Sequence, residues 1–262
     1  MSGTAIVTGA ARGIGAAVVR RLAWEGWAVV AVDISDASAT FGYAFATKDD
    51  LDETVASCRD PDAVMGIVAD ARNHEELVDV VAQAVERFGG VDAAVAAAGL
   101  IAGGQPVWRM DDDHWNALFD VNVGTVRQLA RAVIPAMLQK PSPRHGRFVA
   151  VASAAGHRGL PGLTAYGAAK HACVGFVRGL AADLRGTGIT ATAVSPGSTD
   201  TAMLARTAEL YEMEGAHGFA PQALLERLLD ADEIAAAIAW LCSPDSSALT
   251  GTVVMADGGL TT

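Results

Sequence analysis

Short, wholly apolar runs recur along this chain and constrain its fold more than any other feature. Residues 28–32 include no polar side chain, which is typical of a strand buried on both faces in a parallel sheet covered by helices. We expect strands at residues 5–7, 28–32, 63–68, 93–97, 146–151, 190–194 and 252–256. Amphipathic stretches that predict helices lie between them, at residues 14–24, 73–87, 111–138, 166–184 and 232–241.

This alternation predicts an α/β fold: a single doubly wound Rossmann-type domain over residues 1–262, with a seven-stranded parallel sheet flanked by helices. Two connections are longer than such a fold requires. One is an insertion at residues 34–57, whose part 35–54 is polar and irregular. The other, residues 198–229, is predicted to be a substrate-binding lid, because long connections in compact domains are usually lids or binding loops. Its apolar residues are Met203, Leu204, Tyr211, Met213 and Phe219.

Composition excludes several classes of protein. Hydrophobic residues make up 51% of the 262 and charged residues 19%, too apolar a mixture for a disordered chain. The formal net charge is −11 with no basic run, which disfavours nucleic-acid and anionic-membrane partners. Three scattered cysteines and no His-Glu-x-x-His motif predict neither a disulfide framework nor a metal site. Without a leader pattern or a run of about 18 apolar residues, the sequence predicts a cytoplasmic protein.

A glycine-rich turn follows the first expected strand, in the run Thr8-Gly9-Ala10-Ala11-Arg12-Gly13-Ile14-Gly15. Its three glycines let the backbone turn sharply and approach a pyrophosphate, which then rests on a helix N-terminus. The alternative is an ordinary strand–helix turn. Asp33 ends the second expected strand, where a carboxylate accepts hydrogen bonds from an adenosine ribose and repels a 2′-phosphate. NAD is therefore expected rather than NADP, although Arg12 is placed to reach a 2′-phosphate; the alternative for Asp33 is a loop cap.

Asp70 and Ala71 follow the third expected strand and are candidates for the adenine side of the same site. A helix or turn cap for residues 73–87 is a nearly equal alternative for Asp70. Ala98 and Gly99, after the fourth expected strand, are further candidates for close approach to the cofactor.

Tyr166 and Lys170 are candidates for the chemical step, together with Ser153. Positions i and i+4 share one helix face, so the phenol and the ammonium can point into one cleft. A lysine cation favours the phenolate, which makes tyrosine an effective acid–base catalyst. The Ser153 hydroxyl, at a strand end, can hold a substrate oxygen. Taken singly, the first pair is also common on protein surfaces, and such a serine is often a strand-end cap.

Together these segments resemble the short-chain dehydrogenase/reductase family. The resemblance rests on residues 8–15, Asn122 in Asp-Val-Asn-Val, Ser153, Tyr166, Lys170, Pro196-Gly197 with Thr201, and Asp257-Gly258-Gly259. It implies that Ser153, Tyr166 and Lys170 are catalytic and that Asn122 supports a water relay to the lysine. Asn122 can equally be a helix-interior residue satisfied by backbone. The resemblance also implies that Pro196 and Gly197 lie against nicotinamide, that Thr201 bonds its carboxamide, and that the protein is a homotetramer.

One departure from the family lies after the fourth expected strand. Where the family usually has Asn-Asn-Ala-Gly, this chain has Ala96-Ala97-Ala98-Gly99. The missing asparagines weaken the expected bracing of the sheet or of the adenosine side, whereas Gly99 is kept.

The insertion carries a narrower resemblance. Residues 42–54, Gly-Tyr-Ala-Phe-Ala-Thr-Lys-Asp-Asp-Leu-Asp-Glu-Thr, are similar to the insertion of mycofactocin-coupled members, although Ala44 and Phe45 depart from the usual pattern. This implies an enzyme that retains NAD and passes its electrons to mycofactocin; the alternative is a surface insertion without that meaning.

The expected activity is an NAD-dependent interconversion of a small hydrophobic secondary alcohol and its ketone. A first alternative is a 3-oxoacyl-carrier-protein reductase that uses free NAD(P)H, against which Asp33 and the acidic charge balance argue. A second is a non-catalytic NAD-sensing regulator, which has no need of serine, tyrosine and lysine together.

Overall fold

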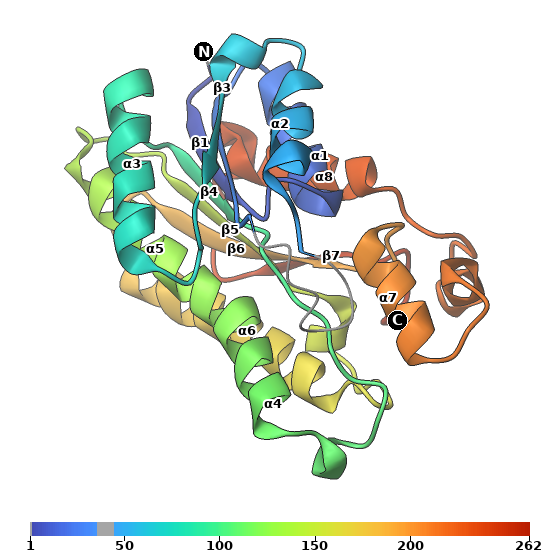
Figure 1. The fold of residues 1–262 in the computed structure, drawn as a ribbon. Coiled ribbons are helices and arrows are strands. Elements are labelled where there is room, and N and C mark those ends of the chain that lie inside the picture. Colours follow the sequence, from blue (N-terminus) through green and yellow to red (C-terminus); the bar gives the residue numbers. More distant parts are fainter. Residues whose placement is uncertain (1, 36–44) are drawn as a thin grey trace.

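The computed structural model describes residues 2–35 and 45–262, and its centre is one parallel sheet of seven strands (Figure 1). The strand order is β3-β2-β1-β4-β5-β6-β7, which confirms the predicted doubly wound fold. The strands are β1 (Thr4–Thr8), β2 (Ala28–Asp33), β3 (Val64–Val68), β4 (Ala93–Ala96), β5 (Arg147–Val151), β6 (Thr190–Pro196) and β7 (Val253–Ala256). Successive crossovers run outward from β1 in one direction and from β4 in the other, so a crevice opens at the carboxyl ends of the strands between them.

Helices cover both faces of the sheet, as the two-sided apolar runs require (Figure 1). One face is covered by α1 (Gly13–Trp24), α2 (Lys48–Ala56) and α8 (Ala231–Cys242). The other is covered by α3 (His74–Phe88), α5 (Thr125–Gln139) and α6 (Thr164–Asp183). Along β1, Ala5 and Val7 pack in the first apolar layer and Ile6 in the second, and all three are fully buried. Both faces of each central strand therefore contribute to the core.

The helix predicted at residues 111–138 is interrupted. It consists of α4 (Asp112–Phe119), a π-helical turn at Asp120–Gly124, and α5. The wider π turn breaks the regular hydrogen-bond pattern at Asn122, and such turns are frequent at functional sites.

Both long connections contain helices that the sequence analysis did not predict. The insertion, expected to be irregular to residue 54, contains α2 from Lys48. The segment at residues 198–229, here named the lid segment for its predicted role, contains α7 (Ala202–Leu210) and a 3₁₀ segment at Ala216–Gln222. A capping box starts α2: the Thr47 hydroxyl accepts from the Asp50 amide, and the Asp50 carboxylate accepts from the Thr47 amide. Phe41 and Tyr43, apolar residues of the insertion that the sequence predicts to fold over the adenosine, lie outside the described residues. In residues 2–35 and 45–262, no helix is both long and apolar enough to span a membrane.

Candidate active site

A cavity of about 650 Å³ lies at the carboxyl ends of the strands. It runs from the glycine-rich turn after β1, past the ends of β2, β4, β5 and β6, to α7 and the 3₁₀ segment that follows it. Every proposed cofactor residue lines it: Gly9, Arg12, Gly13, Ile14, Gly15, Asp33, Asp70, Ala71, Ala98, Gly99, Tyr166, Lys170, Pro196, Gly197 and Thr201. The fold therefore brings residues from most of the chain around one space.

The glycine-rich turn depends on its glycines for close backbone packing. Gly9 has a φ of +69°, and a Cβ there would lie 2.6 Å from the Ala98 nitrogen. A Cβ at Gly15 would lie 1.8 Å from the Gly9 carbonyl oxygen, so no side chain fits. Helix α1 starts within this run, at Gly13, with no side-chain cap and no acidic residue in its first turn. Its N-terminus thus offers backbone N–H groups to an anion, which suits a cofactor pyrophosphate.

Asp33 lies at the end of β2, beside the glycine-rich turn. One carboxylate oxygen accepts from the Ala11 amide at 2.8 Å, and the other accepts from the Ile34 amide at 2.8 Å. Burial raises the pKa of Asp33, and these two hydrogen bonds and the Arg12 charge offset that rise only in part. The carboxylate keeps acceptor capacity toward the cavity, which fits a ribose with two hydroxyl groups.

Asp70 is at the same end of the cavity but already has a strong partner. Its two oxygens accept from the Arg72 guanidinium at 2.6–2.9 Å, and Oδ1 also accepts from the Arg72 amide. Burial acts to raise the pKa of Asp70, but the Arg72 interactions outweigh it and the pKa is lowered. Both sequence interpretations therefore have support: Asp70 lines the cavity, and it also fixes the turn after β3.

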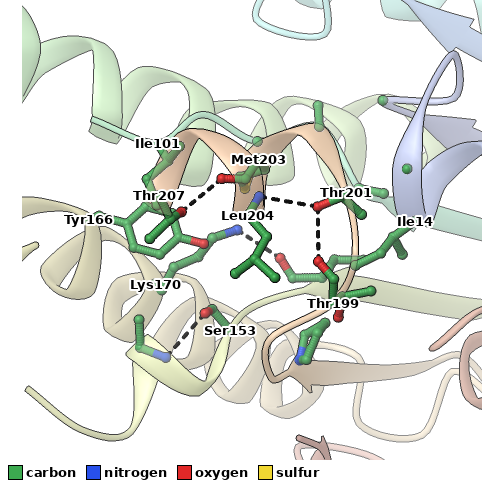
Figure 2. Close-up of a pocket in the computed structure, with 18 of the residues that line it drawn as sticks. Ile14, Ile101, Ser153, Tyr166, Lys170, Thr199, Thr201, Met203, Leu204 and Thr207 are labelled. Carbon is green, nitrogen blue, oxygen red and sulfur yellow. Dashed lines mark hydrogen bonds between the residues drawn. The ribbon is translucent and has the colours of Figure 1, made fainter. Parts of the chain in front are cut away.

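Tyr166 and Lys170 lie one helical turn apart on α6, and both are buried, at 6% and 4% exposure. The Lys170 ammonium is 5.8 Å from the centre of the tyrosine ring and donates to the Val151 carbonyl at 3.0 Å. The Ser153 hydroxyl, just after β5, accepts from the Ala155 amide at 3.1 Å. Figure 2 shows the three side chains facing one space, which Met203 and Leu204 of α7 border.

Asn122 is fully buried in the π turn and braces the loop that follows β4. Its amide donates to the carbonyls of Leu118 and Leu100, each at 2.9 Å, and its oxygen accepts from the Leu100 amide at 3.2 Å. A Cβ at Gly99 would lie 3.3 Å from the Asn122 oxygen and 3.8 Å from the Lys170 nitrogen. Asn122 is thus satisfied by backbone, as one alternative held, and it also lies beside the lysine.

Thr201 has a local structural role at the start of α7. Its hydroxyl donates to the Thr199 carbonyl at 3.2 Å and accepts from the Leu204 amide at 3.4 Å, which caps the helix. A Cβ at Gly197 would lie 2.5 Å from the Asp257 carbonyl, so the turn after β6 packs directly on Asp257. This contact gives a physical reason why the Pro196-Gly197 turn and the Asp257-Gly258-Gly259 motif occur together in this chain.

The far end of the cavity is mostly apolar. It is lined by Ile101, Leu160, Leu163, Met203 and Leu204, with Tyr211, Met213 and Phe219 of the lid segment. The Tyr211 hydroxyl donates to the Pro161 carbonyl at 2.6 Å, which ties the lid segment to the loop before α6. Sequence reasoning missed Arg158 and Leu260 in this lining. No local motif marks them, because only the fold brings them to the cavity.

Comparison with known proteins agrees with this geometry. A sequence model described as Enoyl-(Acyl carrier protein) reductase matches residues 9–261. An uncharacterised NAD-dependent oxidoreductase of Mycobacterium tuberculosis is 37% identical, over 97% of this chain and 94% of its own. The chain belongs to the short-chain dehydrogenase/reductase family.

Two further family members are similar over nearly their whole lengths. The 3-oxoacyl-[acyl-carrier-protein] reductase of Escherichia coli is 34% identical, over 98% of this chain and 96% of its own. A crystal structure of carveol dehydrogenase from Mycobacterium avium in complex with NAD superimposes with a TM-score of 0.92 at 31% identity, covering 98% of this chain and 97% of that one.

Within the described part of the chain, no group of three or more His, Cys, Asp or Glu side chains is placed to hold a metal ion.

Proposed function

We propose that the protein interconverts a hydrophobic secondary alcohol and its ketone, with NAD as its cofactor. That it is an NAD-dependent oxidoreductase follows from its family and from its relatives. The observation that carries the finer proposal is that Ser153, Tyr166 and Lys170 meet beside the apolar part of one cavity. NAD, when bound, supplies the electron-accepting ring.

In the proposed reaction, the Tyr166 oxygen takes the hydroxyl proton of the alcohol while a hydride leaves the carbinol carbon for the cofactor. The Ser153 hydroxyl holds the substrate oxygen by a hydrogen bond. One N–H of the Lys170 ammonium donates to the Val151 carbonyl, which leaves two N–H donors for the cofactor ribose. The buried ammonium lies 5.8 Å from the centre of the Tyr166 ring, so both groups face the same part of the cavity. Asn122 is proposed to hold the adjacent chain segment for a water relay to the lysine.

The substrate proposal rests on the lining of the cavity. Residues Ile101, Leu163 and Met203 are apolar, and the Tyr211 hydroxyl already donates to the Pro161 carbonyl. Such a surface binds an apolar substrate better than a polar one, because it offers few groups to replace the hydrogen bonds that a polar substrate makes with water. The segment at residues 198–229 is proposed to act as the lid over it.

The insertion supports tight retention of NAD. Phe45 packs against the apolar cluster that contains Tyr166 and Leu163, whereas Ala46 belongs to the cluster that contains Ala10 and Ala11 of the glycine-rich turn. One short segment thus reaches both the substrate side and the adenosine side of the cavity. Covering the cofactor in this way would slow its release, since affinity is mostly tuned through dissociation. We propose that mycofactocin reoxidises the retained cofactor, in line with the resemblance of the insertion.

The 3-oxoacyl-carrier-protein reductase function remains the second candidate, because the Escherichia coli relative carries that name. Two observations weigh against it. The net charge of −11 disfavours an acidic carrier protein, and Asp33 lies where a 2′-phosphate of NADPH would need to bind.

Substitution of Tyr166 tests the proposed chemistry. Tyr166→Phe should lower kcat/KM for secondary-alcohol oxidation about 10²–10⁴-fold, the usual contribution of general acid–base catalysis. Tyr211→Phe is a matched control, since it removes a hydroxyl from the same cavity that is bonded to Pro161. Its effect should stay within about tenfold, less than the loss of an acid–base group. Undiminished oxidation by Tyr166→Phe would refute the assignment, and a protein that binds NAD but oxidises no alcohol would favour the regulator.

A further inference from the structure

Arg12 of the glycine-rich turn is approached by an acid from the insertion. Its Nε lies 4.0 Å from the Asp50 carboxylate, and the two side chains are 37% and 33% exposed. Arg12 precedes α1 at the adenosine end of the cavity, where Asp33 also lies. Two acids from different elements, β2 and α2, therefore face one arginine.

The structure holds the Asp50 carboxylate firmly in this place. It accepts from the Thr47 amide at 2.7 Å and from the Thr47 hydroxyl at 2.9 Å, as the third residue of α2. The amide hydrogen bond lowers the pKa of Asp50, so the group is ionised at neutral pH.

Helix α2 is itself anchored on the glycine-rich turn. The Thr54 hydroxyl donates to the Ala11 carbonyl at 3.0 Å within buried surroundings, and Leu51 is 2% exposed in the core. Both backbone groups of Ala11 are thus hydrogen-bonded, since its carbonyl accepts from Thr54 and its amide donates to Asp33. The position of Asp50 relative to Arg12 is set by these buried contacts rather than by the exposed ion pair alone.

A guanidinium beside the adenosine ribose is the group that an NADP enzyme would use, because arginine binds phosphate through paired hydrogen bonds. We propose that Asp50 is a second determinant of cofactor choice: it keeps Arg12 from serving a 2′-phosphate and adds a negative charge that opposes one. Asp33 repels the 2′-phosphate directly, and Asp50 pairs with the Arg12 guanidinium that would otherwise neutralise that phosphate. This inference rests on the proposed NAD function, and its test separates the two.

Competitive loading of the intact protein measures the effect without depending on catalysis. The protein is equilibrated with NAD and an excess of NADP until the bound ratio is constant, and the released nucleotides are quantified by chromatography. The variant is Asp50→Asn, whose amide oxygen still accepts from Thr47 but carries no charge. The control is Asp49→Asn, the same charge change at the neighbouring exposed position of α2.

We expect Asp50→Asn to raise the bound NADP-to-NAD ratio about three- to fivefold, the scale of one exposed ion pair. Asp49→Asn should leave that ratio within about twofold, since surface charges at a distance are screened. In an Arg12→Met background, Asp50→Asn should lose most of its effect, because the cation it releases is gone. An unchanged ratio in Asp50→Asn, or the same rise in Asp49→Asn, would overturn the role of Asp50.

Two further measurements separate the role of Asp50 from the assignment of NAD as the cofactor. Arg12→Met alone should leave the ratio of the otherwise native protein nearly unchanged; a fall in bound NADP would show that Arg12 already serves the phosphate and would refute the inference even if Asp50→Asn did not fold. A native protein that loads mainly with NADP would refute the NAD assignment itself.

Discussion

Replacing Asn122 by alanine tests whether the π turn is held by its side chain. Asn122 is fully buried and makes three hydrogen bonds, to the Leu118 carbonyl and to both backbone groups of Leu100. Alanine leaves the Leu100 amide and two carbonyls without these partners. A buried donor that loses its partner costs about 1–3 kcal/mol, and carbonyls cost less because each has a second lone pair. Together these effects should lower the free energy of unfolding by about 2–4 kcal/mol.

Thermal unfolding measures this loss directly. For a chain of this size, about 1 kcal/mol shifts Tm by roughly 2–4 °C, so the expected fall is about 5–15 °C. Asn116→Ala is the matched control, because Asn116 is an exposed residue of α4 and should change stability by no more than about 0.5 kcal/mol. Equal Tm values for the two variants would show that the Asn122 hydrogen bonds do not hold the turn.

Two predictions concern pH and assembly. Because the pKa of Asp33 is raised by burial, its protonated form, a poorer acceptor for ribose hydroxyls, gains population as pH falls toward that raised pKa. Release of bound NAD should therefore quicken in the acidic range above pH 3.8, and Asp33→Asn should abolish this dependence; a dependence that persists in the variant would exclude Asp33 as its source. By family resemblance we also predict a homotetramer. Light scattering at micromolar concentration should give four times the 26.9 kDa chain mass, and a monomeric mass would rule the tetramer out.

The fold could be predicted because wholly apolar runs, which indicate strands buried on both faces of a sheet, recur along the chain. Every predicted strand occurs within about two residues of its expected bounds, since continuous apolar runs at Ile6, Val30 or Val149 have no stable place outside a covered sheet. Helix α2 was missed because its apolar positions are few; its signal is the Thr47-x-x-Asp50 cap, followed by Leu51 and Thr54.

Side-chain pairing could be predicted less well than backbone position. The glycine-rich turn, Ser153, Tyr166 and Lys170 all line one cavity, because the parallel strand order β1-β4-β5 places the carboxyl ends of these strands at the same edge of the sheet. The pairing of Asp70 with Arg72, by contrast, depends on which of several nearby groups a carboxylate meets. Arg12 could be placed near a 2′-phosphate from its position in the glycine-rich turn, whereas its approach to Asp50 depends on how α2 packs on that turn.

One experiment on the purified protein tests both the retention of NAD and the route of its electrons. Nucleotide released on denaturation is quantified per chain, and alcohol oxidation is then followed with excess free NAD or with an artificial redox dye. Phe45 and the packing of Ala46 and Leu51 predict a protein that carries NAD(H), turns over poorly on free NAD and turns over readily with the dye. Protein that purifies without nucleotide and shows fast, saturable turnover on free NAD would refute both the retention of NAD and its reoxidation by mycofactocin.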